Sequence, residues 1–362
     1  MNQTIKKYPA MTGFGHARPA RSVSNDELSR FMETSDEWIR SRTGIERRNI
    51  SETEDTEKLA EQAARAAIED AGIDIQKIGL IVCATITSAN RSPSTACLVQ
   101  KALGLNDNQT FAFDISAACS GFLFGLRTAD AMMQSGDIEA ALVIGAENLS
   151  KFIDWSDRST AVIFADGAGA AVLTKSGSRP LVHFSRTAGD DEGTIRIKAR
   201  GPQPFGPGPV TDPAGFIEMN GGDTFKFAVS AMEESVRQVL DTAGCTVGDI
   251  DWIVPHQANS RIIGAVTRRM RLPKDRVYIN IDRWGNTSAA SIPIALSEMR
   301  ESGKLADGDR IILTGFGAGF SWGAALAEIG TRASASETAG ARVSESDGPE
   351  AAGPEGSDTI HD

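Results

Sequence analysis

The sequence predicts an α/β protein whose two halves are similar copies packed in layers around one core. The first sign is a gapless match between residues 69–85 (EDAGIDIQKIGLIVCAT) and residues 241–257 (DTAGCTVGDIDWIVPHQ). An Ala-Gly pair and an Ile-Val pair fall on the same positions in both segments. Each segment reads as the end of an amphipathic helix stopped by glycine, a short connection and an apolar strand.

A second similarity links residues 119–145 with residues 286–315. Aligning the Ser-Gly pairs at 135–136 and 302–303 places Cys119 opposite Asn286. In both segments a helix follows a strand and leads into another strand. Strand and helix therefore alternate in the same order twice, which is typical of layered α/β folds.

The expected elements follow this repeat along the chain. In the first copy, a helix ends at Gly72, an apolar strand reaches residue 84, and the strand TFAFDI (110–115) is followed by a helix that begins near Cys119. In the second copy, a helix ends at Gly244, the strand DWIV (251–254) precedes His256, and a helix follows Asn286. The Gly-rich segment 314–326 follows the last of these strands.

Composition divides the chain into residues 1–186 as the N-terminal half, 187–330 as the C-terminal half, and 331–362 as a tail. Between the two copies lies segment 187–224, which has little periodicity and holds five prolines within 199–216; this favours a lid or entrance loop over a linker. The tail holds seven acidic and two basic side chains and almost no large apolar residues. We expect this acidic tail to be disordered because it cannot bury enough apolar surface.

Charge and composition exclude several classes of function. The net charge of −11 argues against nucleic acid as a partner. No apolar run reaches the length of a membrane span, and the N-terminus lacks a secretory apolar region, so we expect a cytoplasmic location and no membrane contact. Four scattered cysteines suggest neither a disulfide framework nor a zinc site.

Cys119 is the first candidate for chemistry. A helix N-terminus offers unpaired N–H groups and partial positive charge, which favour the thiolate and lower the pKa of a cysteine. The apolar GFLFGL that follows predicts a central, buried helix. Cys119 is therefore either a nucleophile at the bottom of a pocket or a cysteine that only fills space in the core.

His256 and Asn286 are the candidate partners of this thiol. His256 follows Pro255 at the end of a buried strand, where an imidazole can serve as a base or a hydrogen-bond donor. Asn286 is either a helix N-cap or an amide donor to a developing oxyanion. Backbone amides of the Gly-rich segment 314–326 could face the same substrate, unless that segment is an ordinary tight connection.

Six motifs in order resemble β-ketoacyl-acyl-carrier-protein synthase III. They are TSDEWIRSRTGIERR (34–48), DISAACSGFLFGL (114–126), DGAGAAVL (166–173), VPHQAN (254–259), GNTSAAS (285–291) and GFGAGFSWGAAL (315–326). The similarity runs from about residue 10 to residue 328. It implies a thiolase fold, in which duplicated α/β halves form a five-layered α-β-α-β-α arrangement, and a homodimer. It also implies a catalytic triad of Cys119, His256 and Asn286.

The resemblance implies an initiating condensing enzyme of fatty acid biosynthesis. Acyl-CoA would acylate Cys119, and malonyl-acyl-carrier protein would then lose carbon dioxide and attack the acyl group. Coenzyme A enters only as the acyl-donor substrate, with no permanently bound cofactor and no metal. The family's oxyanion hole falls on the backbone amides of Cys119 and Ala318. The family has glycine where this chain has Ala318, which puts that geometry in doubt because alanine resists positive φ.

The resemblance also assigns contacts with the substrates. Trp38 and Arg158 would stack on the adenine of coenzyme A, and Asn259 would contact its pantetheine arm. Four basic residues would receive the acidic carrier protein, unless they are only a solvated face: Lys226, Arg261, Arg268 and Arg269. Acetyl-selective members place a phenylalanine before a proline to cap the acyl pocket of the partner subunit, whereas this chain has Ser92 there. A smaller gate predicts longer or branched primers.

Three other functions fit parts of the pattern. The order Cys, His, Asn also occurs in papain-like hydrolases, but no CGSCW-like signature surrounds Cys119. A catalytically silent subunit of a synthase pair is a second alternative, although such chains lose the cysteine. The third is a related condensing or acyl-transfer enzyme of secondary metabolism that uses a different acceptor.

Overall fold

The computed structural model describes residues 7–106, 109–190, 192–198 and 215–333. Its first sheet has the strand order β1 (Tyr8–Ala17), β7 (Asp166–Gly177), β6 (Ala140–Asn148), β4 (Ile78–Ala84) and β5 (Phe111–Ile115). Strand β4 runs parallel to β5 and β6, whereas β7 is antiparallel to both β1 and β6. Because β5 is the last strand, one side of its backbone pairs with no other strand of the described chain.

The second sheet has the order β11 (Trp252–Pro255), β12 (Arg310–Gly317), β13 (Ser321–Glu328) and β8 (Val182–Thr187). Strands β11 and β12 are parallel, and β13 is antiparallel to β12 and β8. The chain passes from the first sheet to the second between Gly177 and Val182, a few residues before the expected boundary at residue 186. The Gly-rich connection predicted after the last strand is the turn between β12 and β13.

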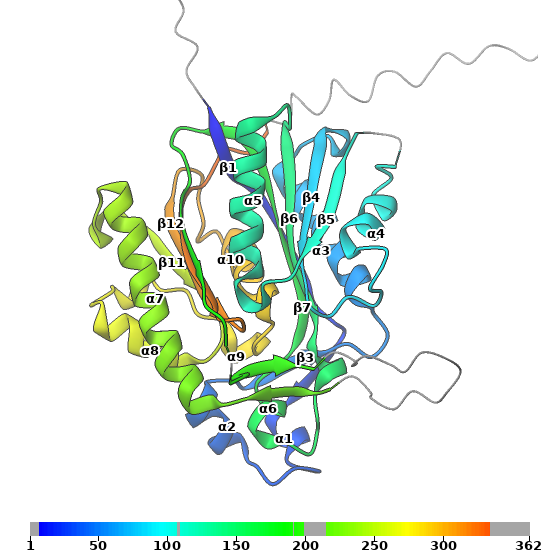
Figure 1. Ribbon diagram of the computed structural model, residues 1–362, viewed down its shortest axis with the longest axis vertical. Coiled ribbons are helices and arrows are strands. Elements are labelled where there is room, and N and C mark those ends of the chain that lie inside the picture. The colour runs from blue at the N-terminus through cyan, green and yellow to red at the C-terminus, as the bar shows by residue number, and fades with distance from the viewer. Residues whose placement is uncertain (1–6, 107–108, 191, 199–214, 334–362) are drawn as a thin grey trace, which may run out of the picture.

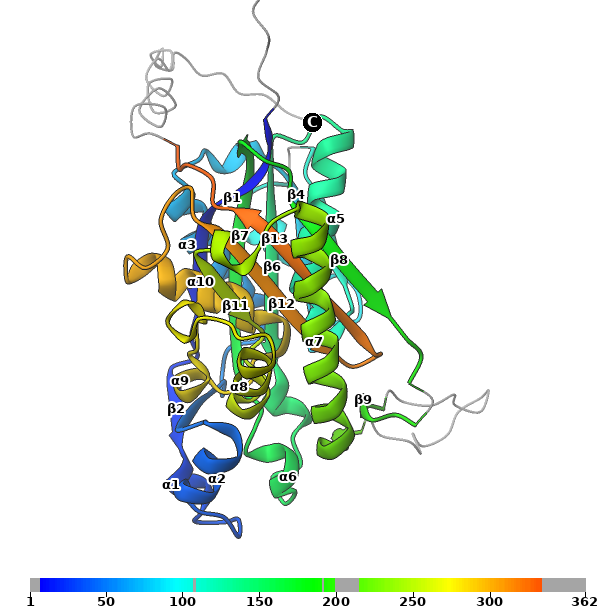
Figure 2. The ribbon, with the colours of Figure 1, turned by 90° about the vertical axis from the view of Figure 1, so that its left-hand side faces the viewer.

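Five layers result from the way helices cover these two sheets (Figures 1 and 2). Helices α3 (Thr56–Ala71) and α4 (Thr95–Ala102) cover the outer face of the first sheet. Helices α5 (Gly121–Ser135) and α10 (Ser291–Glu301) lie between the two sheets and contact both. Helices α7 (Gly221–Ala243) and α8 (Ser260–Arg269) cover the outer face of the second sheet.

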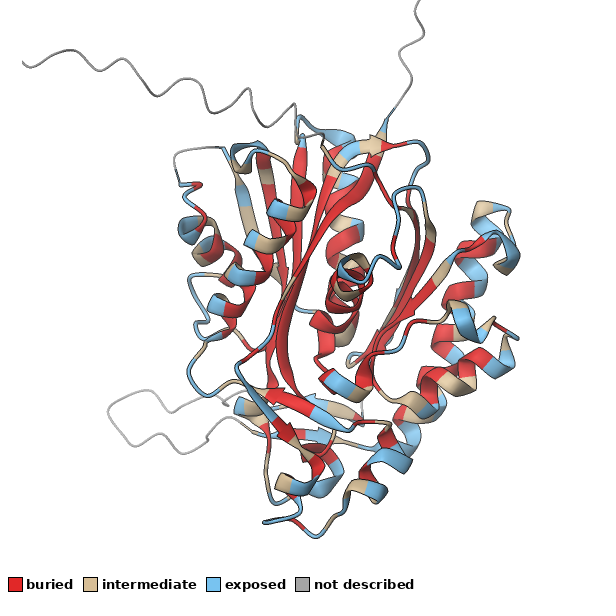
Figure 3. Cartoon of the chain, turned by 180° about the vertical axis from the view of Figure 1, so that it is seen from behind, coloured by how far each residue is buried: buried red, intermediate tan, exposed pale blue. Residues whose placement is uncertain are grey.

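The largest apolar core lies between the sheets, around α5 and α10 (Figure 3). Phe122 and Leu126 of α5 pack there with Leu296 of α10 and Leu313 of β12. The apolar GFLFGL segment therefore forms the expected central helix. The fold predicted from the motifs, a layered thiolase-type α/β protein, is confirmed.

Small elements gather at one end of the molecule, at the lower end in Figure 1. Strand β2 (Arg21–Ser24) pairs with β3 (Arg47–Ile50), and β9 (Ile195–Ile197) pairs with β10 (Ile217–Met219). Four short helices complete this end: α1 (Asn25–Leu28), α2 (Asp36–Thr43), α6 (Arg158–Ala161) and α9 (Ile281–Trp284). Within the described chain, no helix is both long enough and apolar enough to cross a bilayer.

The first sequence match is visible in the fold. Helices α3 and α7 both end at a glycine with left-handed φ, 64° at Gly72 and 61° at Gly244. A 3₁₀ turn follows each glycine, and then strand β4 or β11 begins. The same local sequence thus makes the same helix-turn-strand unit in both halves.

The alignment of residues 119–145 with residues 286–315 is offset by three residues from the correspondence that the structure shows. Ala118 and Ser288 both have positive φ, 45° and 49°, and each opens a 3₁₀ turn that leads into a central helix. By this geometry Cys119 corresponds to Ala289, and Asn286 lies three residues earlier. The alignment from the Ser-Gly pairs was wrong here because α5 has 15 residues and α10 only 11.

Two segments lie partly outside the described residues. The tail is described only to residue 333, where Arg332 pairs with Asp70 and the amide of Ala333 donates to the carbonyl of Ala71. The rest of the tail, residues 334–362, for which disorder is expected, lies outside the described residues. The lid or entrance loop predicted over 187–224 is described at 187–190, 192–198 and 215–224, where β9 pairs with β10, and its remaining residues lie outside the description.

Candidate active site

Cys119 lies in the 3₁₀ turn Ala118–Ser120, at the junction of the two halves. The end of β12 approaches it so closely that a Cβ on Gly317 would lie 2.7 Å from the Cys119 backbone nitrogen. Only glycine allows this approach, and it brings the Gly-rich turn of the second half against the cysteine of the first. The close packing fixes the position of the sulfur.

His256 lies just after β11 and is almost fully buried. Its Nδ1 is 2.6 Å from the Ser291 hydroxyl, which also accepts a bond from the Gln257 amide. Among the described residues, that hydroxyl has no acceptor other than the imidazole, so it donates to Nδ1. The ring proton then resides on Nε2, a buried atom without a hydrogen-bond partner within the described chain. His256 is thereby arranged as a donor toward a ligand.

Asn286 is arranged as a second donor. Its side-chain oxygen accepts the Ser288 amide at 2.9 Å, and its backbone bonds Ile163 and Ala165. This bond fixes which end of the carboxamide is the oxygen. The Nδ2 group remains to donate, and no acceptor for it is present among the described residues. The alternative that Asn286 merely caps α10 does not hold, because the 3₁₀ turn Ser288–Ala290 separates it from that helix.

Burial dominates the electrostatics of the site. It raises the pKa of the Cys119 thiol to about 12, against a smaller opposing effect of the Ser288 hydroxyl. It lowers the pKa of His256 to about 3. The expectation that the pKa of Cys119 is lowered was therefore wrong, because loss of hydration outweighs the effects of the Ser288 hydroxyl and of a backbone amide. At neutral pH the resting pair is a thiol and a neutral imidazole.

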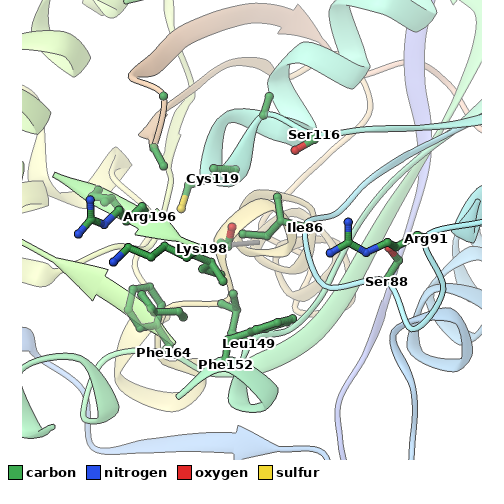
Figure 4. A pocket seen from close by; sticks show the side chains of 18 residues that line it. Ile86, Ser88, Arg91, Ser116, Cys119, Leu149, Phe152, Phe164, Arg196 and Lys198 are labelled. Carbon is green, nitrogen blue, oxygen red and sulfur yellow. The ribbon is translucent and has the colours of Figure 1, made fainter. Parts of the chain in front are cut away.

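Two cavities meet at Cys119. One has a volume of about 540 Å³, and Figure 4 shows the sulfur pointing into it. Its lining is mainly apolar and includes Ile86, Leu149, Phe152, Phe164 and Ile217. The other, of about 290 Å³, contains Cys119, His256 and Asn286 together and reaches Trp38 and Asn259. The sulfur thus has an apolar chamber on one side and a passage with hydrogen-bond donors on the other.

Trp38 lines the smaller cavity, and Arg158 lies beside its ring. The Arg158 guanidinium carbon is 5.1 Å from the centre of the Trp38 ring, and Nη1 donates to the Glu33 carbonyl at 2.7 Å. A ring placed between the two would need about 3.5 Å on each face, so Arg158 has to move before adenine can enter. Arg42 also lies near this ring, at 5.7 Å.

Asn259 caps helix α8. Its Oδ1 accepts the Arg261 amide at 2.8 Å, and its Nδ2 donates to the Arg42 carbonyl at 3.1 Å. It lines the smaller cavity as predicted, but both ends of its side chain are already used within the protein. Its contact with a pantetheine arm stays a prediction.

Ala318 lines the apolar chamber beside Cys119. Its φ is not left-handed, and the residue with positive φ in this turn is Gly319, at 138°. Alanine therefore fits the backbone here without strain, which removes the doubt raised by the missing glycine. The oxyanion role of the Cys119 and Ala318 amides stays a prediction.

The predicted docking residues share the surface of α7 and α8. Arg269 pairs with Glu233 at 2.9 Å, and Lys226 pairs with Asp223 at 3.4 Å. Arg261 and Arg268 form no ion pair with the described residues. They are the two cations of this group that can meet a partner without losing an existing pair.

Ser92 is exposed on the loop between β4 and α4 and does not line the apolar chamber of its own chain. Its neighbour Arg91 does line that chamber. A gating role for Ser92 would therefore act on the chamber of a second copy.

Three residues of the site were missed by sequence reasoning. Ser291 orients His256, Ser288 holds Asn286, and the buried carboxyl of Glu147 lies against Ser288 at 3.3 Å. Both serines belong to the GNTSAAS motif, so the motif itself could have suggested them. Glu147 is the next-to-last residue of the apolar strand β6, and an acidic residue there was the available signal.

A duplicated, five-layered α/β fold that joins a cysteine, a histidine and an asparagine at one buried point defines a condensing enzyme of the thiolase type. Comparisons with known proteins agree with this class. Family models of "3-Oxoacyl-[acyl-carrier-protein (ACP)] synthase III" and of its C-terminal part match residues 113–189 and 240–329. The chain belongs to the β-ketoacyl-[acyl-carrier-protein] synthase III family.

Individual relatives cover nearly the whole described fold. The β-ketoacyl-[acyl-carrier-protein] synthase III of Clostridium perfringens is 45% identical over 326 residues, which is 89% of this chain and 100% of the relative. The crystal structure of the synthase III from Aquifex aeolicus has a TM-score of 0.82 and 42% identity, covering 88% of this chain and 99% of that one. The priming β-ketosynthase of the R1128 polyketide pathway also has a TM-score of 0.82, at 33% identity, and the match covers 92% and 99%.

Membership of this family confirms the predicted enzyme class. The protein is an acyltransferase, and it is an initiating condensing enzyme of fatty acid biosynthesis. The papain-like alternative is excluded by the fold, and the silent-subunit alternative lacks support because all three residues of the predicted triad are present.

Proposed function

We propose that this protein condenses an acyl-CoA primer with malonyl-acyl-carrier protein to give 3-oxoacyl-acyl-carrier protein. The observation that carries the proposal is the position of one sulfur between an apolar chamber and a passage with two free donors. The chamber suits an acyl chain, and the passage suits the thioester arm that delivers it.

In the first half-reaction, Sγ of Cys119 attacks the thioester carbonyl of acyl-CoA. The new S–C bond forms an acyl-Cys119 thioester, and coenzyme A leaves as its thiol. The amides of Cys119 and Ala318 hold the carbonyl oxygen while it carries negative charge. The acyl chain then occupies the apolar chamber.

In the second half-reaction, the malonyl thioester takes the place of coenzyme A. Its carboxylate leaves as carbon dioxide, and the electron pair passes onto the thioester oxygen as an enolate. Nε2–H of His256 and Nδ2–H of Asn286 stabilise that oxygen, and neither group has to give up a proton. The carbanion attacks acyl-Cys119 and releases the product and the thiolate.

Three further parts of the proposal concern the partners. Trp38, Arg158 and Asn259 bind coenzyme A as a substrate, with no resident cofactor required. Arg261 and Arg268, with Lys226 and Arg269, receive the carrier protein. We place the reaction in the cytoplasm, where the sequence predicts this chain to be.

The active protein is a homodimer in this proposal. A second copy would pair along the open side of β5, where Phe111 has 56% of its surface exposed. An unpaired, apolar edge strand is an aggregation hazard unless another chain covers it. Ser88 and Arg91, on the loop after β4, and Ser116, just after β5, line the apolar chamber, so a copy bound at this edge would bring its own Ser92 near that chamber.

A related condensing enzyme of secondary metabolism is the second candidate. Its support is the similarity to a priming ketosynthase of a polyketide pathway, together with Ser92 at the predicted gate. Such an enzyme would use the same acyl-Cys119 but a different primer or acceptor.

Intact mass measurement tests both candidates. Mixing the protein with acyl-CoA should add one acyl mass to Cys119, and malonyl-acyl-carrier protein should remove it as 3-oxoacyl product. The Cys119→Ala variant should show no adduct. Discharge by water alone would contradict a condensing activity, and discharge by free malonyl-CoA but not by the carrier protein would favour the second candidate.

A further inference from the structure

Glu147 is a fully buried carboxyl without a cationic partner among the described residues. Placing an uncompensated carboxylate inside a protein is costly, so its presence calls for an explanation. It lies at the end of β6, directly behind the turn that carries Asn286 and Ser288. The two halves of the molecule meet at this point.

The two oxygens of this carboxyl have different surroundings. Oε2 accepts bonds from the Thr87 hydroxyl at 2.6 Å, the Ile86 amide at 3.3 Å and the Thr85 hydroxyl at 3.5 Å. The Thr87 hydroxyl accepts the Asn148 amide, so its own proton goes to Glu147. Within the described chain, the hydrogen-bond partner of Oε1 is the Ser288 hydroxyl alone, at 3.3 Å. A proton on Glu147 therefore has its place on Oε1, facing Ser288.

Ser288 connects this carboxyl to the sulfur. The turn Ser288–Ala290 contacts the turn Ala118–Ser120, and Ser288 and Cys119 both line the apolar chamber. The Ser288 hydroxyl also acts to lower the pKa of Cys119, as a donor beside the sulfur does. A serine hydroxyl has a single proton, so it can donate to Glu147 or to the sulfur but not to both. The positive φ of Ser288 and the bond from its amide to Asn286 hold the hydroxyl in this position.

We propose that Glu147 and Cys119 share one proton through the hydroxyl of Ser288. The proton leaves Sγ for Ser288 Oγ while the Ser288 proton moves to Glu147 Oε1, so the negative charge passes from the carboxylate to the sulfur. The neutral carboxyl then donates to Ser288, and Ser288 donates to the thiolate. Glu147 touches no substrate and is a positioning residue that acts through Ser288.

This role gives the Cys119 proton a place to go during the reaction, and in this respect it rests on the proposed function. Glu147 keeps the proton while the sulfur is acylated, and coenzyme A leaves as a thiol with a proton from solvent. The condensation expels Cys119 as a thiolate, and Glu147 returns its proton through Ser288. His256 is a poor acceptor for that proton because burial lowers its pKa to about 3, whereas burial raises the pKa of Glu147 to about 8.

Other titratable or charged groups around the pair are few. Among the described groups, Glu147 is the one charge that affects the pKa of Cys119, and it also contributes to the raised pKa of Cys83 in β4. The remaining groups line the two cavities at Cys119: His256, Arg91, Arg196 and Lys198, with Trp38's neighbour Arg42 farther out. None of them contacts Glu147 by a hydrogen bond or an ion pair within the described chain.

The test is the rate at which iodoacetamide alkylates Cys119 as a function of pH, followed by mass mapping of the Cys119 peptide. While Glu147 is protonated, the reactive thiolate should increase tenfold per pH unit. Above the pKa of Glu147, the charge shared with the carboxylate holds the thiolate fraction constant. The wild-type profile should therefore bend to a plateau near pH 8.

Glu147→Gln should remove the plateau, so that the rate continues to rise with pH. Ser288→Ala should lower the rate on the plateau about tenfold, because the thiolate loses a charge-assisted hydrogen bond. Glu57→Gln is the matched control, since Glu57 contributes to the pKa of Cys83 but not to that of Cys119, and its profile should match wild type. Cys119→Ala gives the background from the other thiols.

A straight wild-type profile, or a plateau that survives in Glu147→Gln, would overturn the proposal. If Glu147→Gln does not fold, the plateau in the wild-type pH profile and the alkylation rate of Ser288→Ala on that plateau still test the proposal. Alkylation needs neither acyl-CoA nor carrier protein. Its outcome is therefore independent of whether the proposed condensation is observed.

Discussion

At the scale of single residues, the site separates nucleophile from donors. In the proposed reaction Cys119 forms the covalent bond, and His256 and Asn286 offer N–H groups whose orientation is fixed by Ser291 and Ser288. These fixed orientations matter because preorganised donors stabilise charge in the transition state without reorganising. The proposed chemistry thus depends on the hydrogen bonds by which Ser291 and Ser288 orient His256 and Asn286.

The neutral state of His256 predicts a flat pH profile for decarboxylation. Its pKa in the folded protein is lowered to about 3 from an ordinary value of 6.5, so the uncharged imidazole with Nε2–H persists at every pH above about 3. Release of labelled carbon dioxide from malonyl-acyl-carrier protein should then vary little between pH 5 and pH 8. We would measure it in Cys119→Ala, which removes the thiol from the titration. A loss of rate with a midpoint between 6 and 7 would contradict this assignment.

The small side chain of Ser92 predicts a broad range of primers. Ser92→Phe should lower kcat/KM for a branched five-carbon acyl-CoA at least about tenfold relative to acetyl-CoA, because a phenyl ring takes up space that the extra carbons need. Competition between acetyl-, butyryl- and isovaleryl-CoA measures this, with Ser92→Ala as the control that keeps the pocket open. Strict acetyl selectivity of the wild-type protein would refute the prediction.

The sequence predicted the triad but not the residues that orient it. Cys119, His256 and Asn286 stand in short motifs, which a reader recognises without knowing the fold. The contact between Glu147 and Ser288 joins residues 141 positions apart, and the bond between His256 and Ser291 spans 35. Such pairs arise only when sheets and helices are packed, so local patterns cannot reveal them.

At the scale of elements, the repeat explains both what was predicted and what was not. The helix-turn-strand units at Gly72 and Gly244 were predicted correctly because a glycine C-cap and an apolar strand are local signals. The offset between Cys119 and Asn286 was wrong because the lengths of α5 and α10 depend on the space between the sheets. The positive φ of Ala118 and Ser288, which marks the true correspondence, has no signal in the residue types.

The approach of β12 to the cysteine turn predicts the effect of Gly317→Ala. The added Cβ would lie 2.7 Å from the Cys119 nitrogen, so either the strand or the turn must shift. We expect a loss of about 1–3 kcal/mol in the free energy of unfolding, as for other overpacked sites, and a larger loss in the rate of acylation. Urea denaturation and intact mass after mixing with acyl-CoA measure the two effects.

Gly189→Ala is the control for that substitution. A Cβ at Gly189 meets no atom within 4 Å, and its φ is not left-handed. This variant should keep the stability and acylation rate of the wild type. Equal behaviour of the two variants would show that the contact at Gly317 has no special importance.

At the scale of the whole molecule, two surfaces face partners. The open side of β5 is the proposed contact with a second copy, and the face of α7 and α8 is the proposed contact with the carrier protein. The smaller cavity, between its outer end at Trp38 and the sulfur, is lined partly by residues of α7 and α8, so a carrier protein bound on that face would present its arm to Cys119.

Charge reversal on α8 tests the second surface. Arg261→Glu with Arg268→Glu should raise the KM for malonyl-acyl-carrier protein about tenfold or more and leave the acylation of Cys119 by acyl-CoA nearly unchanged. Lys77→Glu with Lys175→Glu changes the charge equally at a different hollow of the surface and should have no effect. An unaltered KM in the α8 variant would place docking elsewhere.

The exposed phenylalanines test the first surface. Phe111→Asp puts a charge on the open edge of β5 and should convert a dimer into a monomer, because burying the charge in a sheet contact is costly. Phe31→Asp is the matched control, since Phe31 is 62% exposed and follows helix α1, which lies among the small elements away from β5 in Figure 1. Light scattering coupled to gel filtration measures the mass. A wild-type monomer, or a Phe111→Asp dimer, would contradict the assignment.

The two cavities on either side of the Cys119 sulfur have a consequence for the order of events. An acyl group bound to Cys119 lies in the apolar chamber and leaves the smaller cavity open to the next thioester. The acyl-enzyme can therefore persist until a carrier protein binds. Steady-state rates should follow double-displacement kinetics, with parallel lines in reciprocal plots. Free coenzyme A should compete with the second reactant for the smaller cavity while leaving the acyl group in place.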